Sequence, residues 1–330
     1  MDYKAIWLVK MILNTLQTAQ ALPYTALAAE IAALLQDASV QVPVRMVQAL
    51  QGGGSLFVMP AQDARIAITK LITYTPSNAA QGLPTIQGDV IVFDTASGTR
   101  RMLLDGPTVT ARRTAAVSLL AAQQLASVPS GPLLIVGAGV QGTSHLEAFV
   151  QVLGVRQVMV CSRSARSAQQ LVQHAQALFR QLGVAGQASV VTDLASALPH
   201  CTLVVTCTPA QGPVLHTKDL LHPSAFVCAV GAFTPKMTEL SPSLVQHFAQ
   251  HGRIVVDTAD AAHEAGDLMQ AGIDISACAT LQQIVKRAVK ELEPSATAQR
   301  ASNVGKQTLF KSCGWAGWDL AAARLALPAP

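Results

Sequence analysis

The chain has 330 residues, of which half are hydrophobic and 13% are charged; this composition excludes a disordered protein and gives enough length for one large or two moderate domains. A mean hydropathy of +0.36 raises the question of a membrane protein, but no uninterrupted apolar run of about 20 residues could span a bilayer. The net charge of +4 is scattered without a basic run, so nucleic-acid binding has little support.

Two features of the sequence indicate a cytoplasmic protein. The N-terminal stretch MDYKAIWLVKMILNTL lacks the small-residue cleavage site of a signal peptide. The six cysteines show no C-x-x-C spacing, and several lie in apolar runs, where a thiol behaves as a small buried hydrophobe. We therefore expect free thiols in a reducing compartment rather than disulfides or a zinc site.

The first third of the chain is predicted to combine one helix with several strands. Residues 24–38 are rich in good helix formers with apolar residues on one face, which predicts a helix. Short β-rich runs follow at 55–60, 65–74 and 88–106. The last run alternates in polarity around Ser97 and Gly98, which is typical of a β-hairpin. A long helix is predicted from Thr110 to the Pro/Ser/Gly stretch at 128–132.

From Pro132 the sequence alternates between apolar β-rich runs and helix-like segments. The β-rich runs cover residues 132–138, 157–162, 188–192, 202–209, 225–231 and 253–259. This alternation predicts an α/β protein with a doubly wound parallel sheet of the Rossmann type. Further helices are predicted from Leu281 and at the alanine-rich C-terminal end. We place the domain boundary near residue 115 and expect the terminal helix to pack on the first domain.

A glycine-rich loop follows the first strand of this series. Gly137, Gly139 and Gly142 form the pattern G-x-G-x-x-G directly after a strand and before a helix, the context in which it indicates dinucleotide binding. The first glycine allows a tight turn, the second lets the backbone approach a pyrophosphate, and the third lets helix and strand pack closely. The alternative is a glycine-rich turn without a nucleotide, but the strands that follow favour cofactor binding.

The end of the next strand bears on which cofactor binds. Proteins that prefer NAD carry an acidic residue about 20 residues after the glycines, where it binds the ribose 2′-hydroxyl. Here the strand ends in Ser162, Arg163 and Ser164, with Arg166 close behind. An arginine with hydroxyl groups and no carboxylate suits a 2′-phosphate, so we expect NADPH, with NADH as a second option. If Arg163 only opens a solvated helix, the acidic residue is still missing.

Three cationic residues of the first third stand in apolar or turn segments: Arg45, Lys70 and Arg113. A lysine inside an apolar β-rich run is costly without a partner, which makes Lys70 a candidate site residue. The alternative is an edge-strand lysine whose side chain reaches outward to solvent. Arg45 by itself would more often be a surface arginine than a ligand contact.

The sequence resembles the ornithine cyclodeaminase/mu-crystallin family in three segments, which are in chain order GLPTIQGDVIVFD, LLDGPTVTARRTAAVSLLAA and LLIVGAGVQG. The resemblance covers essentially the whole chain. It implies an α/β first domain, residues 1–115 completed by about 301–330, that binds substrate and forms a homodimer. It also implies a Rossmann domain at residues 116–300 and an active site in the cleft between the domains.

The resemblance gives roles to individual residues. Family members bind the α-carboxylate of the substrate with residues at the positions of Arg45, Lys70 and Arg113. The match for Arg113 rests on the Thr-Ala-Ala that follows it, and Arg112 is its neighbouring competitor. Thr85 is placed to contact the substrate or the nicotinamide. The cofactor contacts carried over are Gly137, Gly139, Val140, Gln141 and Gly142 at the pyrophosphate, Ser162, Arg163 and Ser164 at the adenosine ribose, and as looser matches Cys207, Thr208, Val230, Ala232 and Ser312.

The chain departs from the family at the position of a catalytic acid. Cyclodeaminases of the family carry an aspartate shortly after a glycine, in a segment that here begins Gly231-Ala232-Phe233. Phe233 stands at the aspartate position and cannot act as a general acid or base. The family branch with phenylalanine there resembles the reductases of Δ1-pyrroline-2-carboxylate and Δ1-piperideine-2-carboxylate.

We therefore expect NAD(P)H-dependent reduction of a cyclic ketimine acid to L-proline or L-pipecolate. The three cations would hold the carboxylate, Phe233 would form part of an apolar wall, and Lys70 would also govern the proton at the imine nitrogen. Alternatives on the same fold are an amino-acid dehydrogenase, an ornithine cyclodeaminase, and a non-catalytic NADPH-dependent small-molecule carrier of the mu-crystallin kind. The missing aspartate argues against cyclodeamination, and the complete set of cations argues against a carrier.

One acidic cluster offers a different hypothesis, a metal site. Its members are Asp257, Asp260, His263, Glu264 and Asp267. A solvated loop and helix start is favoured over a metal site because the segment is polar and spaced by alanines. We therefore expect no metal, no nucleic-acid partner and no membrane partner. His145, which follows the glycine loop, is expected to cap or pack in its helix.

Overall fold

The computed structural model describes residues 11–216, 221–290 and 306–328. The chain divides into two compact units, one formed by the residues up to Arg113 and from Trp315 onward, the other by Thr114–Gly314. Among the described residues, no helix is both long and apolar enough to cross a membrane.

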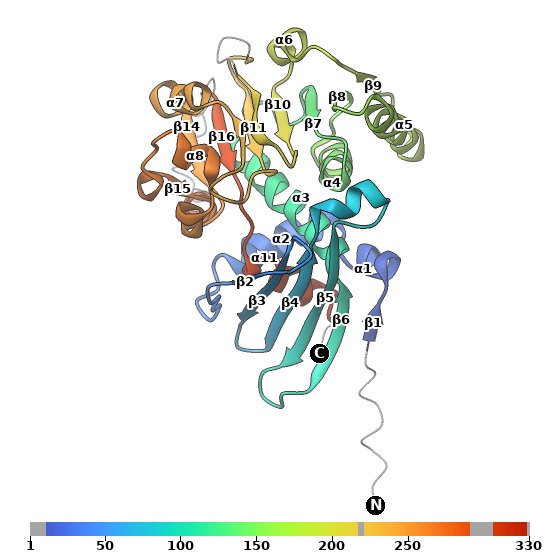
Figure 1. The fold of residues 1–330 in the computed structure, drawn as a ribbon, viewed down its shortest axis with the longest axis vertical. Helices are drawn as coiled ribbons and strands as arrows, with labels where there is room; N and C mark the ends of the chain where they lie inside the picture. The colour runs from blue at the N-terminus through green and yellow to red at the C-terminus, as the bar shows by residue number, and fades with distance from the viewer. Residues whose placement is uncertain (1–10, 217–220, 291–305, 329–330) are drawn as a thin grey trace, which may run out of the picture. The chain divides into compact units, whose positions relative to one another are not determined.

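The first unit contains a six-stranded sheet with helices packed on one face (Figure 1). The strand order is β1-β6-β5-β4-β3-β2, antiparallel apart from the parallel pair of β1 and β6. The strands are β1 (Met11–Leu13), β2 (Met46–Ala49), β3 (Ser55–Gln62), β4 (Ile66–Tyr74), β5 (Ile86–Asp94) and β6 (Arg100–Asp105). The helices are α1 (Thr15–Ala21), α2 (Tyr24–Leu34), the 3-10 turn η2 (Pro76–Gln81) and α11 (Ala316–Ala326). Helix α11 packs on α2, β3 and β4 and lies behind these strands in Figure 1.

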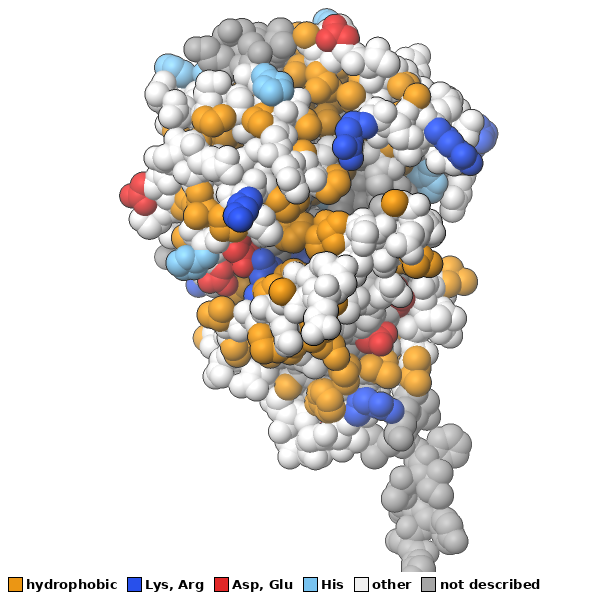
Figure 2. Space-filling model, viewed as in Figure 1, with side chains coloured by type: hydrophobic (Ala, Val, Ile, Leu, Met, Phe, Trp, Pro, Cys, Tyr) orange, Lys and Arg blue, Asp and Glu red, His pale blue; other side chains and the backbone are white. Residues whose placement is uncertain are grey.

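Strand β4 shows how the sequence pattern divides the two faces of this sheet. Ile68, Lys70 and Ile72 are buried beneath the helices, because alternate side chains of a strand point to the same face. Leu71, which points the other way, is 40% exposed. Figure 2 shows hydrophobic side chains over the strands of this unit on the face toward the viewer. One face is therefore a core, and the other is an apolar surface that the helices leave open.

The second unit is a doubly wound α/β domain with a parallel eight-stranded sheet, as predicted. The strand order is β15-β14-β16-β12-β10-β7-β8-β9, and every pair is parallel. The strands are β7 (Leu133–Val136), β8 (Gln157–Cys161), β9 (Gln187–Val190), β10 (Leu203–Thr206), β12 (Phe226–Ala229), β14 (Arg253–Val256), β15 (Ala279–Thr280) and β16 (Thr308–Lys311). A separate parallel pair is formed by β11 (Gln211–Leu215) and β13 (Thr238–Leu240).

The helices of this unit follow its strands along the chain. They are α3 (Gly106–Leu125), which begins in the first unit, α4 (Val140–Ala148) with the π-helical turn η3 (Phe149–Leu153), α5 (Ala165–Gln181), α6 (Leu194–Ala197), α7 (Pro242–His251), α8 (Gly266–Gln270) and α9 (Leu281–Lys290). Short 3-10 turns are η4 (Leu198–His200), η6 (Ala259–His263) and η7 (Ile275–Ala277). The central strands β7, β10, β12 and β16 are buried along their whole length, as strands covered on both faces of a parallel sheet are.

Several elements differ from the sequence-based expectation, among them β1, β2 and α1, which were not predicted. Helix α3 begins at Gly106 rather than at Thr110, because the carboxylate of Asp105 accepts the N–H of Thr108 at 2.9 Å and caps the helix. Strand β16 was not predicted; it pairs with β12 and β14 in the centre of the parallel sheet. We expected residues from about 301 onward to complete the first domain, but β16 lies in the second unit and α11 in the first.

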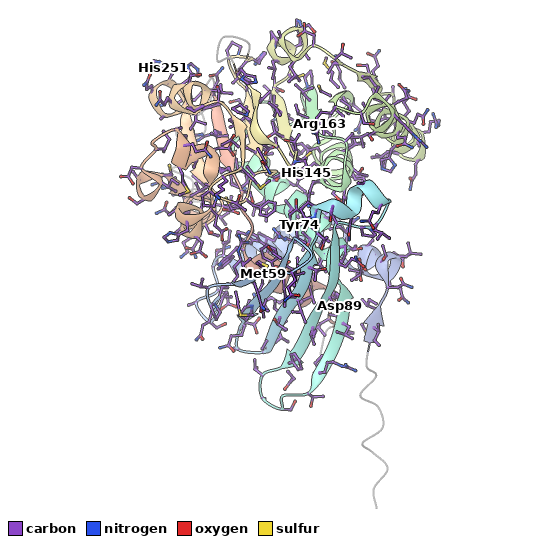
Figure 3. The ribbon with its side chains drawn as sticks, in the orientation of Figure 1. Met59, Tyr74, Asp89, His145, Arg163 and His251 are labelled. Atoms are coloured by element: carbon purple, nitrogen blue, oxygen red, sulfur yellow. The ribbon has the colours of Figure 1, made fainter. Side chains whose placement is uncertain are left out.

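A buried chain of polar side chains links α3, α4 and β12 inside the second unit. The Nδ1–H of His145 donates to the carbonyl of Gln141 (2.7 Å), and its Nε2 lies 2.8 Å from Ser118 Oγ. The thiol of Cys228 donates to the same hydroxyl (3.1 Å). Burial lowers the pKa of His145 to about 4, against the opposing effect of the Gln141 carbonyl. The imidazole, labelled in Figure 3, is therefore a neutral packing element, in line with the role expected for it.

We predict that His145 makes the protein less stable in mild acid. Because its pKa is about 4 when folded and 6.5 when unfolded, the unfolded state binds more protons between these values, and stability falls as pH falls through this range. Lowering the pH from 7 to 5 should cost about 2 kcal/mol from this group. Urea unfolding at both pH values should show a smaller difference in His145→Gln than in the wild type.

His174 provides the matched control. Its hydrogen bond to Glu147, 2.9 Å long, raises the pKa of His174, which is the opposite direction. The variant His174→Gln should not reduce the pH dependence, and an equal reduction in both variants would contradict the assignment to His145.

Candidate functional site

Two of the three cations predicted in the first third, Lys70 and Arg113, pair with one carboxylate that the sequence analysis missed, and the third, Arg45, lies near Lys70. Lys70 Nζ lies 2.8 Å from Oδ2 of Asp319, and Arg113 Nε lies 3.3 Å from Oδ1 of the same residue. Asp319 lies in the first turn of α11 and is fully buried. The charge of Arg45 is near enough to lower the pKa of Lys70, and its guanidinium lies 5.7 Å from the ring centre of Phe57.

The position of Lys70 follows from the register of the sheet. It is paired with Met59 on β3 and with Val90 on β5, so it lies on an internal strand and not on an edge. Its side chain is 1% exposed. The alternative of an edge lysine that reaches solvent is therefore wrong, and the partner that a buried lysine requires is Asp319.

The electrostatic surroundings bring the pKa of Lys70 close to neutrality. Burial lowers it to about 8, with Arg113 and Arg45 acting in the same direction and Asp319 opposing them. Burial dominates because removal from water penalises the charged ammonium. A lysine with this pKa can bind an anion when protonated and can exchange a proton at neutral pH, which a lysine with an ordinary pKa does poorly.

The two neighbouring arginines of α3 have different surroundings. Arg113 is buried and faces Asp319. Arg112 instead donates from Nε to the carbonyl of Leu22 at 2.7 Å, and its guanidinium lies 3.9 Å from the ring centre of Tyr24. Arg112 is thus engaged in holding the α1–α2 connection, and Arg113 is the arginine that joins the cation cluster.

Thr85 is the remaining candidate of the first unit. It is half-buried between η2 and β5, and its carbonyl accepts the N–H of Thr75 at 2.8 Å. This hydrogen bond fixes its backbone, and the proposed contact of its side chain with substrate or nicotinamide stays a prediction.

The glycine loop has the shape that a dinucleotide requires. At Gly137 φ is +113°, and a Cβ there would lie 2.8 Å from the carbonyl oxygen of Cys207. A Cβ at Gly142 would lie 2.1 Å from the carbonyl oxygen of Gly137, which shows how closely α4 approaches the strand. A Cβ at Gly139 would meet nothing within 4 Å, and Val140 is 69% exposed. The loop is therefore closed toward the protein and open at the N-terminus of α4, where backbone N–H groups can bind a pyrophosphate.

The end of β8 presents a cation and hydroxyl groups. Ser164 caps α5 by accepting the N–H of Ser167 at 3.1 Å, and the first turn of α5 contains no acidic residue. Arg163 is exposed (Figure 3), and Ser162 is half-buried. This arrangement suits a phosphate, because Arg163 supplies positive charge and the first turn of α5 contains no carboxylate to accept a ribose hydroxyl.

The looser cofactor candidates gather at one edge of the parallel sheet. Cys207 and Thr208 follow β10, Val230 and Ala232 follow β12, and Ser312 follows β16. Phe233, the predicted substrate contact, comes directly after Ala232. Strands β16, β12, β10 and β7 follow one another in the sheet and run parallel, and the end of β7 carries the glycine loop. The carboxyl ends of parallel strands form the ligand-binding edge of doubly wound sheets. Ser312 Oγ donates to Asp257 at 2.8 Å, so its hydroxyl proton is already used within the protein.

Comparison with known proteins identifies the family. The family of ornithine cyclodeaminases and mu-crystallins matches residues 8–327 of the chain. The chain belongs to this family. Among its relatives, Δ1-pyrroline-2-carboxylate reductase 1 of Burkholderia multivorans is 37% identical over 96% of this chain and 94% of its own length. Ketimine reductase mu-crystallin of Mus musculus is 32% identical over 88% of this chain and 85% of its own length.

Solved structures agree on the fold. Δ1-pyrroline-2-carboxylate reductase of Thermococcus litoralis, in complex with NADH and L-proline, has a TM-score of 0.83 at 23% identity and covers 96% of each chain. An archaeal alanine dehydrogenase dimer with bound NAD has a TM-score of 0.80 at 22% identity, covering 96% of this chain and 94% of the other. At these identities the likeness establishes a shared fold and no shared activity.

Sequence reasoning missed three buried charged residues of this family member, although each stands out in its sequence segment. Asp319 and Lys311 are single charged residues inside apolar segments, and Glu239 stands inside a short strand.

The acidic cluster considered as a metal site has other partners in the structure: Asp257 binds Ser312, and Asp267 Oδ2 lies 2.9 Å from Lys311 Nζ. Within the ranges that the structure describes, no group of three or more histidine, cysteine or acidic residues is arranged to hold a metal.

We predict that Asp319→Asn strongly destabilises the protein. Removal of the carboxylate leaves Lys70 and Arg113 buried without a counter-charge, which should cost about 3–5 kcal/mol. Addition of Lys70→Met should recover part of this loss, because it removes one of the uncompensated charges. Urea unfolding of both single variants and the double variant measures the coupling. Additive effects would show that the ion pair does not couple the two residues.

Proposed function

We propose that this chain is an NAD(P)H-dependent reductase of a cyclic ketimine acid, forming L-proline from Δ1-pyrroline-2-carboxylate, L-pipecolate from Δ1-piperideine-2-carboxylate, or both. The observation that carries the proposal is the buried pairing of Lys70 and Arg113 with Asp319, with Arg45 near enough to Lys70 to affect its pKa. With Lys70 protonated, the positive charges of these residues outnumber the single negative charge of Asp319, which suits a small carboxylate. The names of the Burkholderia multivorans and Mus musculus relatives support the same reaction class.

The proposed chemistry asks the protein mainly to orient the substrate. Arg45 and Arg113 would hold the carboxylate by charge-assisted hydrogen bonds, and Phe233 would supply apolar contact to the ring. Lys70, with a pKa of about 8, would keep a proton at the imine nitrogen. The bound coenzyme would supply hydride to the carbon of the C=N bond. No step needs a carboxylate at the position of Phe233, in contrast to the release of ammonia from a free amine.

We propose NADPH as the preferred coenzyme, with NADH as a weaker one. Exposed Arg163 with Ser162 and Ser164 supports this preference, since a 2′-phosphate would gain a charge-assisted hydrogen bond there. The glycines from Gly137 to Gly142 would bind the pyrophosphate. The Thermococcus litoralis neighbour was solved with NADH, which supports NADH as the second coenzyme.

We further propose a homodimer formed by the first unit. Its sheet leaves apolar side chains on the face opposite α11, including Leu71 at 40% exposed and Met46 at 53%, and such a face favours contact with a second surface. The alanine dehydrogenase of the same fold is described as a dimer. A cytoplasmic location is proposed from the six free thiols, which suit a reducing compartment.

The decisive experiment is an NADPH-oxidation assay with the two cyclic imines and, separately, with pyruvate plus ammonia. We expect kcat/KM to be at least about tenfold higher for a cyclic imine, and higher with NADPH than with NADH. Arg163→Ala should remove the coenzyme preference without changing the imine preference. A preference for pyruvate plus ammonia would replace the proposal by an amino-acid dehydrogenase, and NADPH binding without any turnover would replace it by a carrier.

Arg113→Met should raise KM for the cyclic imine by roughly two orders of magnitude, since a charge-assisted hydrogen bond to the carboxylate is worth about 2–3 kcal/mol. Arg112→Met is the matched control, because Arg112 is adjacent in sequence but is held against Tyr24 and Leu22. The control should lower thermal stability and leave KM close to that of the wild type. Similar KM values for the two variants would refute the assignment of Arg113.

A further inference from the structure

Glu239 joins the ends of two neighbouring strands. It lies on β13, is fully buried, and accepts the N–H of Gly231 at 2.7 Å through Oε2. Its Oε1 accepts both the N–H (2.7 Å) and the hydroxyl (2.9 Å) of Thr208. Gly231 follows β12 and Thr208 follows β10, and these strands are adjacent in the parallel sheet. One carboxylate thus ties together two segments at the ligand-binding edge of the sheet.

The same segment is held from its other side by Lys311. The Nζ of this fully buried lysine donates to the carbonyl of Ala232 at 2.5 Å and lies 2.9 Å from Oδ2 of Asp267. Asp267 Oδ1 in turn accepts the backbone N–H groups of Glu239 (2.6 Å) and Leu240 (2.9 Å). Glu239, Asp267 and Lys311 therefore form one buried network, which we call the strand-end network.

The strand-end network leaves no room for a side chain at Gly231. A Cβ at this position would lie 2.1 Å from the carbonyl oxygen of Thr208 and 2.5 Å from Oε1 of Glu239. The backbone of Gly231 must therefore pack directly against Thr208, and Glu239 occupies the space beside it. Only a glycine permits this close approach, so the position of the Glu239 carboxylate depends on the absence of a side chain at residue 231.

The energetics of buried charge argue that this network does more than stabilise the fold. Three charges withdrawn from water contribute little net stability compared with apolar residues of the same size. Burial opposes the charge of Lys311, but Asp267, Cys313 and Glu239 together keep the pKa of Lys311 above its ordinary value, so it remains protonated. Apart from the Lys311–Asp267 pair and the Thr208 hydroxyl, the side-chain contacts of Glu239 and Lys311 described above are made to backbone groups of Thr208, Gly231 and Ala232, and Thr208 and Ala232 are candidate cofactor residues.

We infer that Glu239 and Lys311 are positioning residues that hold the segments Cys207–Thr208 and Gly231–Ala232 in the arrangement that receives the nicotinamide half of the coenzyme. This inference rests on the proposed function. The adenosine and pyrophosphate groups would be bound by other residues, those of the glycine loop and of Ser162–Ser164. The network therefore acts on one half of the coenzyme and leaves the other half unaffected.

The selectivity for one half of the coenzyme gives a direct test. In Glu239→Gln, an amide NH2 group replaces one of the two carboxylate oxygens and cannot accept a hydrogen bond. Either Thr208 or Gly231 therefore loses its hydrogen bond to this side chain. Lys311→Met removes the bond to Ala232 together with the ion pair to Asp267, leaves the contacts of the Glu239 side chain in place, and is an independent second variant. Isothermal titration calorimetry should be performed with NADPH and with 2′-phospho-ADP-ribose, which lacks the nicotinamide. We expect Kd for NADPH to rise at least about tenfold in each variant, while Kd for 2′-phospho-ADP-ribose stays within about twofold.

Asp274→Asn supplies a matched control in the same unit. Asp274 is a carboxylate that caps the turn η7 by accepting the N–H of Ser276 at 3.1 Å, and its variant should bind both ligands as the wild type does. Equal weakening of both ligands in Glu239→Gln and Lys311→Met would overturn the inference in favour of a general structural role, and so would unchanged binding of NADPH. Wild-type protein that binds NADPH but reduces no cyclic imine would instead refute the proposed function, and the binding comparison would still decide this inference.

Discussion

The buried ion pair between Lys70 and Asp319 is the constraint around which the first unit is organised. Its partners come from the middle of β4 and from the last helix of the chain, and both side chains are almost completely withdrawn from water. Such a pair adds little stability by itself, but either partner left alone is strongly destabilising. The sheet therefore requires α11 to dock with Asp319 opposite Lys70. At the other end of α11, Arg324 is held by Asp37 and Asp63, which fixes the helix along its length.

This constraint also explains how three cations can be kept close together. Arg45, Lys70 and Arg113 repel one another, and Asp319 offsets part of that repulsion. The remaining positive charge is what a substrate carboxylate would compensate. Because Asp319 is fixed by the packing of α11, the protein does not have to rearrange charged groups when an anion binds, and preorganised charges act more strongly than mobile ones.

The second unit uses buried charge for a different purpose. Glu239 and Asp257 accept backbone N–H groups where the chain leaves its strands, Asp257 from Cys313 and Gly314 at 3.0 and 2.9 Å. Backbone donors at strand ends have lost their sheet partners and need others when buried. Carboxylates fill this role and at the same time fix the loops that follow. In both units, buried charges therefore determine where the candidate site residues lie.

The features that could be predicted from the sequence are those that depend on the pattern of neighbouring residues. The alternation in β4, the apolar strands of the parallel sheet and the spacing of Gly137, Gly139 and Gly142 are periodic or contiguous patterns, and the structure confirms the elements they predict. Strand β16 was not predicted because its four residues include a lysine, which is unusual in a central strand. That lysine is tolerated because Asp267 supplies a counter-charge and the carbonyl of Ala232 accepts a hydrogen bond, and both come from distant segments.

The sequence by itself determined that this chain folds as an α/β protein with a glycine loop after a parallel strand, and that Lys70 needs a partner. Only the tertiary structure decided who that partner is and which of two adjacent arginines joins it. Neighbouring residues of a helix point about 100° apart, so Arg112 meets Tyr24 while Arg113 meets Asp319. A local sequence pattern shows that a buried charge requires a counter-charge. Which residue supplies it depends on the distant element that packs against the charge.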